Sequence, residues 1–138
     1  MIVNKRIITY TGIGVAALVA VLLIVWLYKR FFRKSAVDDL PVNVDNVTFS
    51  DAELKIMAGQ LYTAMHGAGT DEKAIYRVLE KLKTKDDWNA LVKAFGIKEG
   101  GTWVSPFRGN LLDWLQDELS AKEMKRVNEI LNLIGISI

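Results

Sequence analysis

The 138-residue sequence contains no cysteine, only two prolines and only one histidine. The absence of cysteine excludes disulfide bonds and thiolate metal sites. The single histidine, His66, has no partner in the sequence that would orient its ring for acid–base catalysis. Phosphate-loop and dinucleotide-binding motifs are also missing. We therefore expect that the protein is not an enzyme.

Acidic residues are missing from the first 37 positions, since all 16 lie at or beyond Asp38. From Ser35 onward, 12 basic residues stand against 16 acidic ones. A region with this mildly negative balance and no basic stripe is poorly suited to bind nucleic acid. The remaining six basic residues flank an apolar run, where we expect them to meet a membrane surface: Lys5, Arg6, Lys29, Arg30, Arg33 and Lys34.

The apolar run covers residues 7–28 and contains no acid and no strong base. At ~1.5 Å per residue a helix of this length spans roughly 33 Å, enough for a hydrocarbon core of about 30 Å. Lipid offers no partners for backbone N–H and C=O groups, so a helix is required there. The sequence predicts a single-pass anchor within residues 1–34. Its small, aromatic and flanking residues are Ile7, Tyr10, Gly12, Ala16, Ala20, Trp26, Tyr28, Lys29 and Arg30.

Three properties of the anchor leave alternatives. A cleaved signal peptide has an apolar stretch of only about 7–15 residues, so we favour a permanent anchor. More basic residues follow the run than precede it, which favours a cytoplasmic C-terminal domain, or an internal one in a virion membrane. Gly12, Ala16 and Ala20 could let two helices approach closely, or could simply be small residues common in such spans. We favour the second interpretation.

Residues 35–49 contain acids, Asn and one Pro without a helical period, so they are predicted to be a linker. Helical periodicity starts at Ser50, which forms a capping-box motif with Glu53. A second capping box, Ser120 with Glu123, opens the last helix.

Five amphipathic helices are expected in residues 50–138, because apolar residues recur there at helical spacing. Each helix has one face to bury, so the five must pack together as one all-α bundle. The predicted helices cover residues 51–65, 70–82, 85–95, 110–119 and 121–134.

The segment 97–109 interrupts the helical pattern with three glycines, a proline and the apolar residues Trp103, Val104 and Phe107. Loops of this length are uncommon in small domains and are often functional. Its apolar side chains could fold back onto the bundle or form an exposed contact patch. We favour packing against the bundle and keep the interaction loop as the alternative.

The octet Met65–Glu72 (MHGAGTDE) resembles the Met-x-Gly-x-Gly-Thr-Asp turn that joins the first two helices of an annexin repeat. The helices around it are similar to those of the family as well. The segment Leu111–Ser120 (LLDWLQDELS) closely resembles the fourth helix of a repeat. The resemblance covers one whole repeat, about residues 50–135, and implies its five-helix fold.

In annexins this turn binds calcium, and the resemblance implies the same ligands here. These are the carbonyl groups of Met65, Gly67 and Gly69 with the carboxylate of Glu118. Ca²⁺ requires six to eight oxygens, and a glycine-rich turn can direct carbonyl groups that a bulkier backbone could not. The same turn is also explained without metal, because its glycines allow left-handed backbone and Thr70 can cap the next helix. We favour this second explanation.

Two functions remain. The first is a non-enzymatic structural or assembly protein of a bacterial membrane or a phage virion, anchored in a bilayer and bound to a protein partner or to itself. The second is a calcium-dependent phospholipid-binding module of annexin type. The glycine turn and Glu118 discriminate between them.

Overall fold

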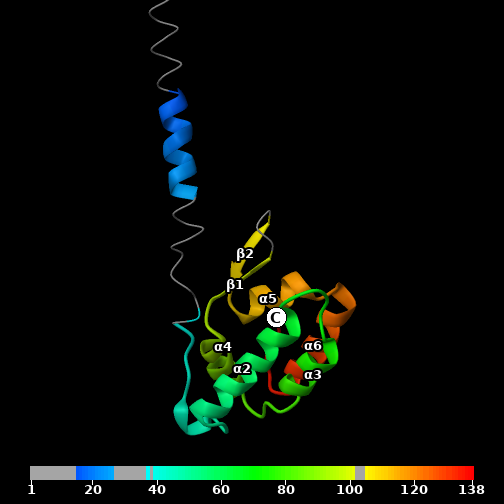
Figure 1. Cartoon of the computed structure of the whole chain (residues 1–138). Coiled ribbons are helices and arrows are strands. Elements are labelled where there is room, and N and C mark those ends of the chain that lie inside the picture. The colour runs from blue at the N-terminus through cyan, green and yellow to red at the C-terminus, as the bar shows by residue number, and fades with distance from the viewer. Residues whose placement is uncertain (1–14, 27–36, 38, 102–104) are drawn as a thin grey trace, which may run out of the picture. The chain divides into compact units, whose positions relative to one another are not determined.

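The computed structural model describes residues 15–26, 37, 39–101 and 105–138. The chain divides into two compact units, Met1–Lys34 and Ser35–Ile138. In the first unit, residues 15–26 form an α-helix (Figure 1). Within the described ranges, no helix is both long enough and apolar enough to cross a membrane. The predicted span 7–28 lies partly outside these ranges, so the anchor stays a prediction.

The second unit is mostly helical, as the sequence predicts (Figure 1). Helix α2 lies at its centre and packs against α3, α4 and α5, while α6 packs against α3. All five predicted helices are present. Their bounds are α2 (Asp51–Met65), α3 (Glu72–Leu79), α4 (Lys85–Phe95), α5 (Leu111–Glu118) and α6 (Ala121–Asn132).

Side-chain caps fix where the helices begin. The predicted capping boxes of Ser50 and Ser120 are both formed, each with the glutamate three residues later. Thr84 caps α4 and Asn110 caps α5 in the same reciprocal way. Each cap satisfies backbone N–H groups that have no partner inside the helix. These local signals explain why the helix starts could be predicted closely.

The start of α3 differs from the prediction. Thr70 was expected to cap this helix, but Asp71 is the cap, and its carboxylate accepts a hydrogen bond of 2.9 Å from the Ala74 N–H. The Thr70 hydroxyl instead donates to Glu118. A carboxylate is the stronger acceptor at a helix N-terminus, which leaves the hydroxyl of Thr70 to act as a donor.

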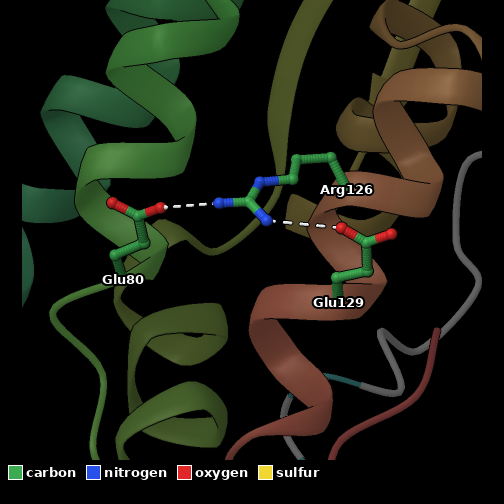
Figure 2. Close-up of polar contacts among 3 residues, drawn as sticks. All are labelled: Glu80, Arg126 and Glu129. Atoms are coloured by element: carbon green, nitrogen blue, oxygen red, sulfur yellow. Dashed lines mark hydrogen bonds and ion pairs between the residues drawn. The ribbon is translucent and has the colours of Figure 1, made fainter.

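One continuous core holds the five helices together. Its largest fully buried side chain is Trp114, followed by Phe95. Surface ion pairs add little to it. Figure 2 shows Arg126 of α6 between Glu80, 3.4 Å away, and Glu129, 3.3 Å away. These side chains are about half exposed, where an ion pair contributes about 0–1 kcal/mol.

The segment 97–109 was expected to be a loop, but it contains an antiparallel hairpin of strands β1 (Lys98–Gly101) and β2 (Pro106–Gly109). Figure 1 shows the hairpin, in yellow, extending beyond the helices. Its register pairs Gly100 with Phe107. A Cβ atom at Gly100 would collide with the Trp114 ring, so glycine is needed for the strand to lie on α5. The contact is tertiary, so no alternation of apolar and polar residues in the sequence predicts the strand.

Residues 39–49 were expected to be part of a linker, but they lie along the bundle as a strap. The strap contains the short 3₁₀ helix η1 (Val44–Asn46). Val37 just before it is buried in the core, and four strap residues pack against the same core: Leu40, Val42, Val47 and Phe49. The described part of the predicted linker thus belongs to the folded unit Ser35–Ile138.

Candidate binding site at the glycine turn

The glycine turn, residues 66–70, joins α2 to α3 at an exposed corner of the domain. Gly67 and Gly69 have φ angles of 120° and 92°, which residues with a side chain rarely adopt. Nothing lies within 4 Å of the position that a Cβ would take at either glycine. The turn is closed by a hydrogen bond of 2.9 Å from the Asp71 N–H to the Ala64 carbonyl. Its backbone therefore faces open space.

The structure brings Glu118 to this turn. The Thr70 hydroxyl donates a hydrogen bond of 2.8 Å to Glu118 Oε2, across 48 positions of sequence. Glu118 is the last residue of α5 and is partly buried. The turn and the carboxylate that the annexin resemblance pairs with it are therefore in contact.

The proposed calcium ligands fit this arrangement in part. Gly67 and Gly69 are exposed and Glu118 is partly buried, so a cation from solvent could approach all three. Met65, in contrast, has no exposed surface, so its carbonyl could bind a cation only after a change in the turn. Among the described residues, no three His, Asp or Glu side chains converge on one point. A cation here would have to rely on backbone carbonyl groups, water and one carboxylate, which implies weak binding.

An aromatic cluster lies directly beside the turn. The Trp114 ring is 5.4 Å from the Tyr62 ring and 6.4 Å from the His66 ring, centroid to centroid. The Lys98 ammonium lies 5.1 Å from the centroid of Tyr62 and 5.4 Å from that of Phe95. This cation–π contact connects the first residue of the hairpin to α2 and α4. The cluster therefore joins the glycine turn and the hairpin into one structural end of the domain.

The predicted interaction loop is only partly described. Phe107 is partly buried and its ring packs edge-on against Trp114, with centroids 5.3 Å apart. Packing against the bundle is thus the interpretation that holds for Phe107. Trp103 and Val104 lie outside the described residues, so their role stays a prediction.

The aspartate pair at the start of α4 has a role that the sequence did not reveal. Carboxylates at a helix start are ordinarily solvated, but Asp87 has no exposed surface. It accepts hydrogen bonds from Thr48 and from the backbone N–H groups of Lys83 and Thr84. Burial acts to raise the pKa of Asp87, but these hydrogen bonds outweigh it, and the pKa lies below its usual value.

Its neighbour Asp86 holds the same strap from the outside. Asp86 Oδ1 accepts from the Asn43 N–H at 2.7 Å, and Oδ2 accepts from Asn46 Nδ2 at 3.2 Å. The Thr84-x-x-Asp87 spacing could have indicated a capping box. Nothing local indicates the strap as a second partner, because Thr48 and Asp87 are 39 positions apart.

A groove of about 970 Å³ lies between α2 and α3, away from the aromatic cluster. Its floor includes the small residues Gly59, Ala64 and Ala74. Ile56, at its edge, is 61% exposed. The side chain of Ile56 gives the groove one apolar edge. This groove is a second candidate surface on the domain.

The predicted anchor is described only in its middle part. Ala16, Ala20 and Trp26 lie in the helix 15–26, whose side chains are all exposed. The other predicted anchor residues lie outside the described residues: Ile7, Tyr10, Gly12, Tyr28, Lys29 and Arg30. The described part of the predicted anchor is thus a helix of apolar residues.

No protein-family model matches the chain, and no curated protein and no solved structure is found to be similar to it. The annexin resemblance and its calcium ligands therefore stay predictions that rest on the turn sequence and on the residues around it.

Proposed function

We propose that the protein is a non-enzymatic, single-pass membrane protein of a bacterial membrane or a phage virion, whose helical domain binds a protein partner in a structural assembly. The observation that carries the proposal is the helix 15–26. Its large apolar side chains are 43% to 64% exposed. Each apolar side chain left in water costs about 1.5–3 kcal/mol relative to burial. Lipid is the partner that fits an apolar run with basic residues on both sides.

The anchoring half of the proposal is tested by alkaline extraction of membranes that contain the intact chain. The chain should stay in the membrane fraction. The paired change Val19→Asp with Leu23→Asp should release it, because each acid costs about 2.5–3.5 kcal/mol at the centre of a span. Leu133→Asp is the matched control, since Leu133 is 86% exposed in the helical domain. Release of the unmodified chain would refute anchoring.

The partner half of the proposal is supported by the groove between α2 and α3. A photo-crosslinking residue in place of Ile56 should give one discrete product in the membranes of origin. The same residue in place of exposed Lys125, on α6, is the control. If both positions give the same products, the groove does not select a partner.

A second candidate is calcium-dependent binding of phospholipid. The contact between Thr70 and Glu118 favours it, because it brings the exposed glycine turn to a carboxylate. If the site takes calcium, Gly67, Gly69 and Glu118 would hold the ion, and the ion would supply a positive charge for a lipid phosphate.

Thermal unfolding of the intact chain with millimolar calcium and with chelator tests this candidate. A ligand that binds only the folded state raises stability by ~2.7 kcal/mol at a hundredfold excess over its dissociation constant. The rise should be lost in Glu118→Gln and kept in Glu129→Gln. The absence of any rise in the unmodified chain would leave the glycine turn as architecture.

A further inference from the structure

One wall of the groove between α2 and α3 carries no charge. Helix α2 lines the groove with four exposed residues, which are Ile56, Gly59, Gln60 and Thr63. Their spacing of i, i+3, i+4 and i+7 places them on one face of the helix. The exposed face of a helix in a globular domain normally carries charged residues. Another molecule can therefore cover this wall without removing water from a charge.

The floor of the groove is made of small residues. No heavy atom lies within 4 Å of the position that a Cβ would take at Gly59. Ala64 and Ala74 line the groove beside it. Small side chains at a helix contact let a further helix approach closely, because the distance between two helix axes depends on the residues at the contact. A groove between two packed helices therefore has a shape that suits a third helix lying along them.

The other wall of the groove is cationic at one end. Arg77, on α3, and Lys81, just after it, both line the groove and are exposed. They are four positions apart, so they are neighbours on one face. Within the described part of the chain, neither side chain has an ion-pair partner. The unit from Ser35 onward has more acids than bases, so this pair is a local exception to its charge.

The acids that line the same groove do not neutralise this pair. The Glu80 carboxylate contacts Arg126 at 3.4 Å, on the α6 side of α3. Asp71 caps α3, and its carboxylate accepts a hydrogen bond of 2.9 Å from the Ala74 N–H. Asp71 also lies at the start of α3, whereas Arg77 lies near its end. The positive charge at the end of α3 is therefore available to a partner.

We propose that this groove binds an amphipathic helix of a partner protein, with the apolar side of that helix on α2 and an acidic edge facing Arg77 and Lys81. The proposal rests on the partner binding proposed above, and it adds the chemistry of the partner. Apolar contact on the uncharged wall supplies affinity, and the opposite charges fix the register and select the partner.

Two synthetic helical peptides test the charge selection directly. The acidic peptide has about 21 residues, or three heptads, with Ala and Leu along one face, Glu along one edge and Gln elsewhere. The basic peptide has Lys in place of every Glu. Fluorescence anisotropy measures the binding of each to the intact chain in micelles of an uncharged detergent. The acidic peptide should bind about tenfold more tightly. Equal affinities, tighter binding of the basic peptide, or no binding of either would overturn the proposal.

A charge reversal in the groove should reverse the preference. The double variant Arg77→Glu with Lys81→Glu should bind the basic peptide more tightly than the acidic one. The matched control is Lys122→Glu with Lys125→Glu, which makes the same change in net charge at exposed positions of α6. Thermal unfolding checks that both variants fold. If the control on α6 reverses the preference as well, net charge and not the groove selects the peptide, and the proposal is wrong.

A bulky side chain on the floor should block the groove. Gly59→Phe places a ring where the structure leaves open space, so the domain should still fold, but the acidic peptide should lose about tenfold in affinity. Asn132→Phe, at an exposed and uncharged position of α6, is the matched control and should bind as the unmodified chain does. Unchanged affinity in Gly59→Phe would show that the peptide binds elsewhere.

The photo-crosslinking residue at Ile56 separates this proposal from partner binding itself. A discrete product in the membranes of origin, with no preference for the acidic peptide, contradicts the partner's proposed chemistry alone. The same products at Ile56 and Lys125 contradict partner binding at the groove, and the acidic helix with it. A product of two chains that the purified protein gives at Ile56 and not at Lys125 would show that a second copy occupies the groove, and it would also overturn the proposal.

Discussion

Asp87 and Glu118 are carboxylates at opposite ends of one domain, and they differ in what surrounds them. Asp87 has no exposed surface, and its oxygens accept from Thr48, Lys83 and Thr84. Glu118 is only partly buried and accepts from the hydroxyl of Thr70, beside a turn that faces open space. A carboxylate surrounded by protein donors serves the fold. One beside exposed backbone at an open turn has room for a ligand.

The largest effect is expected from removing the buried carboxylate. Asp87→Ala leaves the partly buried N–H groups of Thr48, Lys83 and Thr84 without their acceptor, which should lower the free energy of unfolding by about 3 kcal/mol. The matched control is Asp86→Ala, which removes hydrogen bonds at the exposed side of the same strap and should cost about 1 kcal/mol. Urea denaturation of both variants measures the difference. Equal losses would mean that Asp87 is not the main attachment of the strap.

The contribution of Asp87 to stability should depend on pH. The pKa of Asp87 is lowered in the folded protein, so its contribution is fully present above the ordinary value of 3.8. That contribution is lost as the pH falls through the lower pKa of the folded state. Asp87→Asn should therefore lose less stability on acidification than the unmodified chain. Urea midpoints measured from about pH 6 to about pH 2, the range in which carboxylic acids titrate, follow this loss. The same acid dependence in both proteins would contradict this role.

The position of the hairpin on α5 is tested by a glycine pair. Gly100→Ala places a methyl group against the Trp114 ring, which should cost about 1–3 kcal/mol. Gly59→Ala is the control, because nothing lies within 4 Å of its Cβ position on α2. Alanine there should stabilise the helix by about 1 kcal/mol. If Gly100→Ala is neutral in thermal unfolding, the hairpin is not fixed by this contact.

The smallest effect is expected at the glycine turn. Thr70→Val removes the hydroxyl that donates to Glu118, a loss of about 1 kcal/mol because water can replace it at a partly exposed site. Thr63→Val, at an exposed position of α2, controls for the loss of a hydroxyl. A loss at Thr70 as large as that of Asp87→Ala would show that both carboxylates serve the fold, and the comparison would fail.

The sequence predicted what is encoded locally. Apolar spacing and the capping boxes at Ser50 and Ser120 depend on residues within one or two turns of each other. The pairing of the glycine turn with Glu118 came from the annexin resemblance, and the Thr70 contact agrees with that pairing.

Features that depend on distant contacts could not be predicted. The hairpin needs Gly100 against Trp114, and the strap needs Thr48 against Asp87. The cap of α3 was assigned one residue early, because a threonine and an aspartate are both good caps. The position of Glu118 explains why Thr70 is not the cap, because the Thr70 hydroxyl donates to Glu118.

The central claim is that the helix 15–26 lies in lipid, and the depth of a single label tests it most directly. A fluorophore on Leu18→Cys, in the exposed apolar helix, is compared with one on Leu133→Cys in vesicles with nitroxides deep in the acyl chains. The account predicts strong quenching at position 18 and none at position 133. Quenching of the label at position 18 by water-soluble iodide, and not by the lipid nitroxide, would contradict it.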